Sequence, residues 1–159
     1  MNKLTSKNSS NDIQLTIAIP TYNRAKYLNK SLECIVSQMS TSSNVELIIV
    51  DNASTDETYK VCQKYKELAA FSYFKLDQNL GMSASQYECF LKANGNYLLI
   101  FADDDYLEPN GLQIILNTIS TGYDLYAFNY KSAKSKKENL PIGPIDSCKF
   151  EYGFQLMNH

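Results

Sequence analysis

Three consecutive carboxylates, Asp103, Asp104 and Asp105, follow the apolar run from Tyr97 to Ala102 in the sequence YLLIFADDDYLEP. Adjacent like charges repel, and each raises its neighbours' pKa values unless a positive group lies among them. No Lys or Arg is close to the triplet in the sequence. The sequence therefore supplies no local counter-charge, and a bound cation, a helix N-terminus or solvent has to neutralise the carboxylates.

A hard divalent cation explains the triplet best, because capping a helix requires one Asp and not three. Mg²⁺ and Mn²⁺ take oxygen ligands, usually one or two carboxylates together with substrate phosphates. A metal site of this kind predicts a diphosphate substrate. The sequence contains neither a G-x-x-x-x-G-K-[ST] loop nor a G-x-G-x-x-G motif after the first apolar run, so it matches neither a P-loop nucleotidase nor a dinucleotide fold.

The sequence around the triplet predicts alternating strands and helices, which would position the three carboxylates. Helical periodicity is present at 25–39 and 55–71, and a further helix is expected to begin at Pro109. The predicted strands, rich in Ile, Val, Leu, Tyr and Phe, are residues 15–20, 45–51, 71–76, 96–102 and 123–130. This order predicts an α/β fold with an open, mostly parallel sheet, right-handed crossovers and helices on both faces.

A helix start is also predicted from its capping residues. Ser54 followed by Glu57 has the spacing of a capping box, and Asp56 is placed where the helix dipole favours an anion.

Polar and turn-forming residues follow the strands, where open α/β sheets bind their ligands. The first strand ends in PTYNR, the second in VDNASTD and the fourth in ADDDYLEP. Each segment alone has a plain structural interpretation: Asp51 and Asn52 as a turn and cap, Tyr22 as a packed aromatic, Gly81 as a loop residue. Gly81 also suits a close approach of backbone to ligand.

The length, net charge and cysteine content of the chain exclude several classes of protein. The 159 residues are enough for one domain, and a net charge of −2 argues against nucleic acid as the main partner. No apolar run is long enough for a membrane span, and residues 1–14 read as a disordered lead-in. The four cysteines form no C-x-x-C pair, which favours buried free thiols in a reducing cytoplasm over a zinc site.

Four motifs together, IAIPTYNRAKYL, ELIIVDNASTDET, QNLGMSASQ and GNYLLIFADDDYLEP, resemble family 2 glycosyltransferases of the GT-A fold over residues 15–130. The resemblance implies inverting transfer from a nucleoside-diphosphate sugar, usually UDP- or dTDP-linked, with Mg²⁺ or Mn²⁺ as cofactor. It also implies a role in bacterial surface polysaccharide assembly. The acceptor would be a saccharide or a lipid-linked molecule. The enzyme would be cytoplasmic and would associate peripherally with the inner face of the cytoplasmic membrane.

The resemblance also assigns residues. Asp104 becomes the metal ligand, and Asp105 either joins the metal site or caps the following helix. The residues assigned to the donor sugar nucleotide are Pro20, Thr21, Tyr22, Arg24, Asp51, Asn52, Gly81 and Asp103. Asp51 and Asn52 would recognise the base and the ribose, and Asp103 would contact the ribose or a phosphate.

The sequence departs from the family pattern in several places. Ala102 replaces the first Asp of the D-x-D motif, and Asn52 stands where the family most often has Asp. Ser85 stands where the family often has Arg, which would be a partner for the diphosphate. The basic segment 131–137 has two interpretations: it replaces that arginine, or it is a solvated loop. Residues 131–159 read as this basic loop and the start of an acceptor-side region. No catalytic base is assigned, so a donor-binding module without turnover is the alternative to an enzyme.

Overall fold

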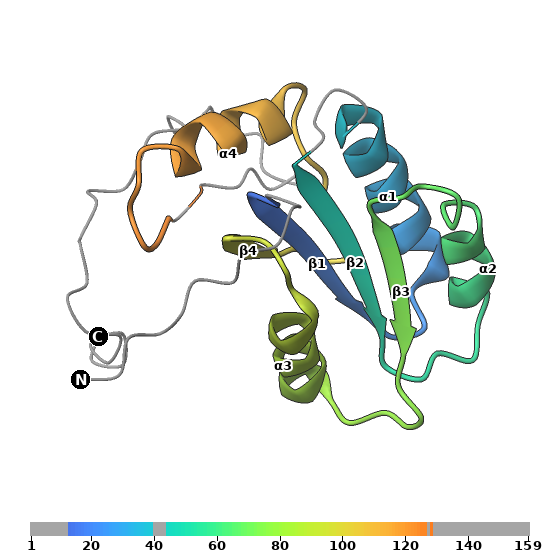
Figure 1. Ribbon diagram of the computed structural model, residues 1–159. Helices are drawn as coiled ribbons and strands as arrows, with labels where there is room; N and C mark the ends of the chain where they lie inside the picture. The colour runs from blue at the N-terminus through green and yellow to red at the C-terminus, as the bar shows by residue number, and fades with distance from the viewer. Residues whose placement is uncertain (1–12, 40–43, 127, 129–159) are drawn as a thin grey trace, which may run out of the picture. The chain divides into compact units, whose positions relative to one another are not determined.

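The computed structural model describes residues 13–39, 44–126 and 128. Strands and helices alternate along the chain, as the sequence predicts (Figure 1). The elements are β1 (Leu15–Thr21), α1 (Ala25–Met39), β2 (Val45–Asp51), α2 (Thr58–Gln63), β3 (Phe71–Lys75), α3 (Met82–Lys92), β4 (Tyr97–Ile100) and α4 (Gly111–Ile119).

The four strands form one sheet in the order β3-β2-β1-β4, and every pair is parallel. All seven residues of β2 are buried, which explains why its sequence is almost continuously apolar. Thr21 pairs with Asp51 at the carboxyl ends of β1 and β2, and Ala18 pairs with Ile100 at the end of β4. Continuing that register brings Asp103 level with Thr21.

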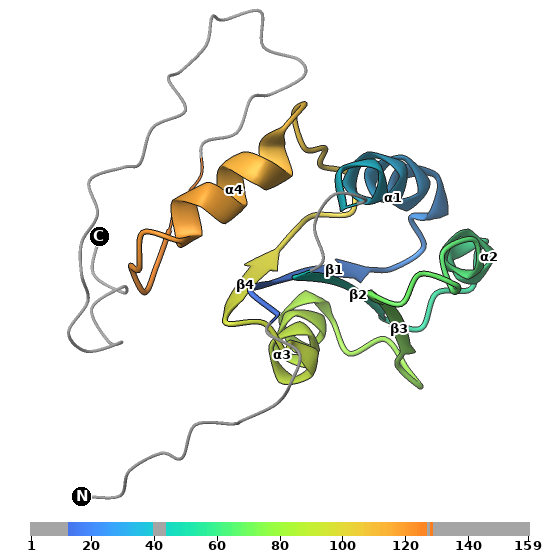
Figure 2. The same cartoon turned by 45° about the horizontal axis from the view of Figure 1, so that its top comes forward.

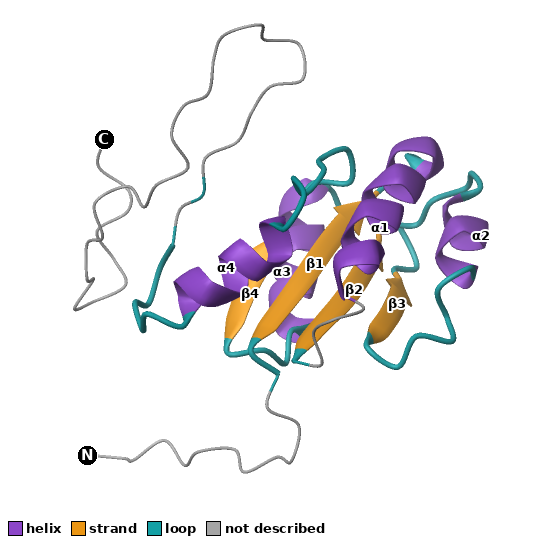
Figure 3. Cartoon of the chain, turned by 90° about the horizontal axis from the view of Figure 1, so that it is seen from above, coloured by secondary structure: helices purple, strands orange, loops and turns teal. Residues whose placement is uncertain are grey.

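Helices cover both faces of the sheet, which confirms the predicted α/β architecture. Figures 2 and 3 show α1 and α2 on one face and α3 on the other. The helical pattern of α1 places Leu28, Leu32 and Ile35 against the sheet, each fully buried. Burial of each such side chain contributes about 1.5–3 kcal/mol.

A buried carboxylate closes the amino-terminal edge of the sheet. Glu46 on β2 accepts hydrogen bonds from the Thr16 hydroxyl (2.5 Å) and the Asn94 N–H (2.6 Å). The Thr16 hydroxyl in turn accepts from the Gly95 N–H at 2.8 Å. Gly95 has no room for a side chain, because an added Cβ would lie 2.6 Å from the Thr16 nitrogen. This network sets how the chain enters β4.

The predicted helix over 55–71 is much shorter in the structure. α2 ends at Gln63, and residues 64–67 form turns. The ring of Tyr65 in these turns lies 6.0 Å from the ring of Phe71, the first residue of β3. The capping box is also wrong. The Ser54 hydroxyl accepts from the Asn23 N–H at 2.8 Å, and Asp56 accepts from the Thr58 N–H at 3.0 Å.

The predicted strand over 123–130 is not observed at its described positions, 123–126 and 128. The chain divides into two compact units, Met1–Leu116 and Asn117–His159. Within the second, the Tyr126 hydroxyl accepts from the Tyr123 N–H at 2.8 Å and donates to the Ile119 carbonyl at 3.2 Å, which holds a turn in place of a strand. The basic segment 131–137 lies outside the described residues.

Cys34, Cys62 and Cys89 are free thiols, and Cys148 lies outside the described residues. Burial raises the pKa of Cys62 to about 12, with a contribution from the negative charge of Asp51. Burial likewise raises the pKa of Cys89 to about 11. Both thiols stay protonated near neutral pH. Among the described residues, no helix combines the length and apolar character that a bilayer crossing requires.

Candidate functional site

The predicted site residues meet where the strands end. The Asn52 N–H donates to the Thr21 carbonyl at 2.9 Å, which joins the ends of β1 and β2. The Thr21 hydroxyl donates to Oδ2 of Asp103 at 2.7 Å, which joins β1 to the segment after β4. Three strands that are distant in sequence therefore place polar groups at one edge, the carboxyl edge.

Asp103 is the buried member of the carboxylate triplet, with 9% of its side chain exposed. Its Oδ2 accepts from Thr21, and its Oδ1 lies 2.8 Å from Nε of Arg24. Burial raises the pKa of Asp103; the Thr21 hydrogen bond and the Arg24 charge oppose that rise, and the neighbouring Asp104 adds to it. Asp103 is thus a carboxylate whose oxygens are both engaged within the protein.

The counter-charge for the triplet comes from Arg24, 80 residues before Asp104 in the chain. The Nη2 group of Arg24 donates to Oδ2 of Asp104 while its Nε faces Asp103. The guanidinium carbon lies 4.8 Å from the centre of the Tyr27 ring at the start of α1. The sequence indicates no local counter-charge, and Arg24 supplies one from a distant segment, because register rather than sequence proximity brings the arginine to the carboxylates.

Asp105 is exposed, and its N–H donates to the Ala102 carbonyl at 3.2 Å. Its predicted role as a cap is wrong, because α4 begins at Gly111 and not at Pro109. The start of α4 is fastened to α1 instead: the Leu112 N–H donates to the side-chain oxygen of Gln38 at 3.1 Å.

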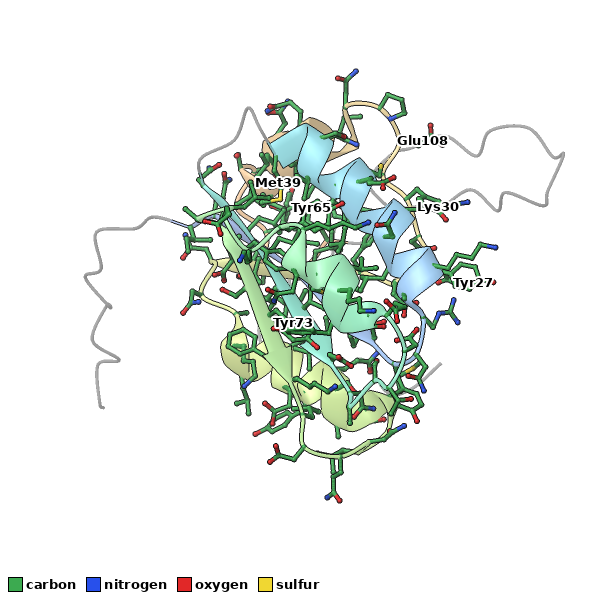
Figure 4. The ribbon with its side chains drawn as sticks, turned by 90° about the vertical axis from the view of Figure 1, so that its right-hand side faces the viewer. Tyr27, Lys30, Met39, Tyr65, Tyr73 and Glu108 are labelled. Carbon is green, nitrogen blue, oxygen red and sulfur yellow. The ribbon has the colours of Figure 1, made fainter. Side chains whose placement is uncertain are left out.

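Asp51 ends β2 with a fully buried carboxylate. Its Oδ1 accepts from the Ser54 N–H at 2.8 Å, and its Oδ2 accepts from the hydroxyl of Tyr73 on β3, labelled in Figure 4. Burial and this hydrogen bond raise the pKa of Tyr73. The two bonds hold the turn in which Ala53 adopts a φ of 66°. In this conformation Asp51 shapes the edge and presents no carboxylate oxygen to a ligand.

Asn52 connects the edge to the start of α3. Its Nδ2 donates to Oδ1 of Asn79 at 2.8 Å and to the Gly81 carbonyl at 3.2 Å. Its Oδ1 accepts from the Leu80 N–H at 2.9 Å. Only 4% of Asn52 is exposed. Gly81 has a φ of 83°, and an added Cβ would meet nothing within 4 Å, so glycine serves the backbone conformation there.

Pro20 and Tyr22 complete the predicted set at this edge. Pro20 is half-buried in β1, paired with Val50. Tyr22 is 42% exposed. Its ring is therefore accessible to a ligand, unlike the buried groups of Asp51 and Asn52.

Two residues that build the edge were not predicted in this role: Asn23 was not singled out, and Asp56 was expected only as an anion at the start of a helix. Asn23 has a φ of 53°, and its side-chain oxygen accepts from the Thr55 N–H at 2.7 Å. Asp56 accepts from the Ala25 N–H at 3.0 Å and so anchors the first turn of α1. The available signal was the type of residue, since Asn tolerates positive φ and both side chains bond to nearby backbone.

The donor set suits a divalent cation that completes its coordination with ligand oxygens. No group of three or more His, Cys, Asp and Glu side chains is arranged as a metal cage in the part of the chain that the structure describes. Asp104 is half-exposed and its Oδ1 makes no hydrogen bond to a described residue, whereas Asp103 beside it is engaged. A cation held by one or two carboxylates plus phosphates, as Mg²⁺ commonly is, fits this arrangement.

Comparison with known proteins agrees with the geometry. Residues 16–154 match the family model described as glycosyl transferase family 2. Abequosyltransferase RfbV of Salmonella typhimurium is 33% identical over 119 residues, which are 74% of this chain and 36% of RfbV. The crystal structure of S. aureus TarS 1–349 in complex with UDP-GlcNAc has a TM-score of 0.63 at 26% identity, covering 68% of this chain and 31% of that one.

A third likeness concerns the fold alone. The mannosyltransferase PcManGT from Pyrobaculum calidifontis, in complex with GDP-Man and Mn²⁺, has a TM-score of 0.60 at 22% identity. The alignment covers 69% of this chain and 32% of PcManGT. The aligned part of this chain thus spans about a third of RfbV, of the TarS 1–349 segment and of PcManGT. The matched family model and the parallel α/β sheet together show that the chain belongs to glycosyl transferase family 2 and has the GT-A fold.

Proposed function

We propose that the carboxyl edge binds the nucleoside diphosphate of a sugar donor, UDP- or dTDP-linked, for glycosyl transfer with inversion. The observation that carries the proposal is the continuous polar network that joins Asp104, Arg24, Asp103 and Thr21, and then Asn52 through its backbone, at one edge of a parallel sheet. Parallel α/β sheets bind ligands at this edge.

The related TarS structures support the class of ligand. TarS 1–349 has been crystallised with UDP-GlcNAc and with UDP, at 26% identity to this chain. The exposed ring of Tyr22 provides a surface on which a base can stack, and Arg24 provides a positive charge for phosphate oxygens. Backbone groups around residues 20–22 and 79–81 are then left to read the base, because the side chains of Asp51 and Asn52 are committed internally.

Asp104, with Asp103 beside it and Asp105 next in the chain, would hold Mg²⁺ or Mn²⁺. The ion supplies positive charge for the diphosphate that leaves when the sugar is transferred. The acceptor that we propose is a saccharide or lipid-linked component of a bacterial surface polysaccharide. TarS, named a poly(ribitol-phosphate) β-N-acetylglucosaminyltransferase, supports that class. Transfer would take place in the cytoplasm, at the inner face of the cytoplasmic membrane.

A donor-binding module without turnover is the second candidate. It is favoured by one observation, that both carboxylate oxygens of Asp103 and of Asp51 are engaged within the protein, so neither residue offers a free general base. The two candidates share the donor site and differ in catalysis. Release of UDP from UDP-GlcNAc in the presence of a saccharide acceptor distinguishes them.

Titration calorimetry with UDP and dTDP, with Mn²⁺ or with EDTA, tests the donor site. We expect binding that requires Mn²⁺ and that Asp104→Asn abolishes. Glu67→Gln is the matched control, because it also removes one exposed carboxylate but lies in the turn before β3. Equal affinity in Mn²⁺ and EDTA, or full binding by Asp104→Asn, contradicts the metal assignment. Absence of nucleotide binding under both conditions contradicts the proposed function.

A further inference from the structure

The contacts of Arg24 place a positive charge where the carboxylates of Asp103 and Asp104 converge. Nε faces Oδ1 of Asp103 at 2.8 Å, and Nη2 donates to Oδ2 of Asp104. The ring of Tyr27 lies against the guanidinium, 4.8 Å from its carbon. An arginine that bridges two carboxylates and stacks on an aromatic ring is a well-oriented cation.

The two contacts differ in how easily they can be broken. Asp103 is 9% exposed at its side chain and is held a second time by the Thr21 hydroxyl at 2.7 Å. Asp104 is 48% exposed and has Arg24 as its only hydrogen-bond partner among the described residues. Solvent screens the Asp104 pair far more than the Asp103 pair. Arg24 Nε makes no hydrogen bond to a described residue, so its link to Asp103 is an ion pair that burial of Asp103 protects from screening. Arg24 can therefore release Asp104 while this ion pair and the Tyr27 contact persist.

We propose that Arg24 is an internal counter-ion that couples metal binding to donor binding. In the free protein its positive charge neutralises Asp104 and its Nη2 occupies Oδ2, which leaves only Oδ1 of a neutralised carboxylate for a divalent cation. When it releases Oδ2, its Nη2 is free to donate to an oxygen of the diphosphate. This inference rests on the proposed function, because it takes Asp104 as the metal ligand and a diphosphate as the ligand.

The consequence is positive cooperativity between the two ligands. A cation alone has to compete with Arg24, so Mn²⁺ binds weakly without nucleotide. A diphosphate offers Arg24 a replacement anion, so the competition is relieved when both ligands are present. Thermodynamic linkage requires that Mn²⁺ raise nucleotide affinity by the same factor by which nucleotide raises Mn²⁺ affinity.

A purely structural role for Arg24 predicts something different. If the arginine only fastens the turn after β1 to the segment after β4, its loss lowers the free energy of unfolding and leaves Mn²⁺ affinity unchanged or weaker. The sign of the change in metal affinity without nucleotide therefore separates the two roles.

Electron paramagnetic resonance of Mn²⁺ measures that sign directly, because bound Mn²⁺ loses the sharp signal of the free ion. Four full-length proteins are titrated with Mn²⁺ in the absence of nucleotide: the parent, Arg24→Gln, Arg24→Lys and the double variant that combines Arg24→Gln with Asp104→Asn. Arg24→Gln is expected to bind Mn²⁺ about fivefold to tenfold more tightly than the parent, and the double variant to lose that gain. With saturating UDP the order reverses, because the glutamine variant lacks the positive donor for the diphosphate.

Arg24→Lys keeps the charge but not the planar fork that reaches both carboxylates, so it is expected to show about a twofold to threefold gain without UDP. It carries the test if circular dichroism shows that Arg24→Gln is unfolded. Mn²⁺ affinity in the folded variants that equals or falls below the parent value overturns the inference. Failure of the proposed function is recognised separately, because the parent then binds no UDP with or without Mn²⁺.

Discussion

Replacing Asn52 with Asp is a nearly isosteric change that the structure predicts to be costly. The Leu80 N–H fixes Oδ1 of Asn52, so Nδ2 has to face Asn79 and the Gly81 carbonyl. The Gly81 N–H, at 2.9 Å, likewise fixes the facing atom of Asn79 as its oxygen. An aspartate would therefore direct a carboxylate oxygen at two acceptors, 2.8 Å and 3.2 Å away.

The magnitude follows from the bonds and the burial. Two hydrogen bonds worth about 1 kcal/mol each are lost, and two acceptors are left without a donor. The new charge would be buried at a position that is 4% exposed, next to the buried carboxylate of Asp51. We expect Asn52→Asp to lower the free energy of unfolding by about 3 kcal/mol at pH 7.

The destabilisation by Asn52→Asp should depend on pH in a way that identifies its cause. Burial and the facing oxygens raise the pKa of the introduced carboxyl in the folded state above its unfolded value of about 4. Below pH 4 the protonated carboxyl donates a hydrogen bond to Asn79, and the penalty is small. The penalty develops as the pH rises through the folded-state pKa.

Urea unfolding of the parent, Asn52→Asp and Asn52→Ala at pH 7 and pH 4 measures these terms. The alanine variant removes these two hydrogen bonds and also the one from the Leu80 N–H, without a titrating group, so its destabilisation relative to the parent should be equal at both pH values. If Asn52→Asp is as stable as the parent at pH 7, the hydrogen-bond polarity assigned to this network is wrong, and the side chain at position 52 is available to contact a base.

Three further substitutions and one control test the backbone and the charges around the sheet. Gly95→Ala should lower the free energy of unfolding in urea by about 2–3 kcal/mol, because the new Cβ would lie 2.6 Å from the Thr16 nitrogen; Gly111→Ala, whose nearest contact would be 3.4 Å, should cost little. Ala53→Gly should raise stability in the same assay by up to about 1 kcal/mol, because Ala53 has a φ of 66°. Burial raises the pKa of Asp56, but the hydrogen bonds that it accepts from Thr58 and Ala25 together outweigh burial, so its pKa lies below the ordinary value. The stability that Asp56 contributes is therefore present above pH 4 and lost as the pH falls through the folded-state pKa, so melting curves of Asp56→Asn and the parent should converge in acid.

Each of these expectations has a contradicting result. A Gly95→Ala variant as stable as Gly111→Ala would show that β1 and β4 can separate without cost. A loss of stability in Ala53→Gly equal to that in Ala93→Gly, where φ is −69°, would show that the positive φ at Ala53 carries no strain. A difference between Asp56→Asn and the parent that is constant from pH 6 to pH 3 would remove Asp56 as a titrating contributor.

β1 and β2 could be predicted well because their burial on both faces requires an almost continuously apolar sequence. The strand predicted over 123–130 is not observed at its described positions. β2 was predicted with its exact bounds, Val45–Asp51. α2 could not, because helix-forming residues continue to Ala70 while the chain has to turn after Gln63 to enter β3. Tertiary context overrides local propensity in that segment.

The location of the site could be predicted, but its internal pairing could not. Parallel topology alone brings Thr21, Asp51 and Asp103 to one edge. The link between Arg24 and Asp104 depends on the register of β4 against β1, which pairs Ile100 with Ala18. Proximity along the sequence does not reflect that register, so it cannot predict that Arg24 is the counter-charge of Asp104.

Nuclear magnetic resonance of the amide groups during titration with UDP and Mg²⁺ tests the central claim, that the carboxyl edge binds the donor. We expect the largest chemical-shift changes at residues 21–24, 79–81 and 103–104. Residues Thr16, Glu46, Asn94 and Gly95, which close the opposite edge of the same sheet, should be unchanged. The largest changes at that opposite edge, or no changes at saturating UDP, would contradict the account.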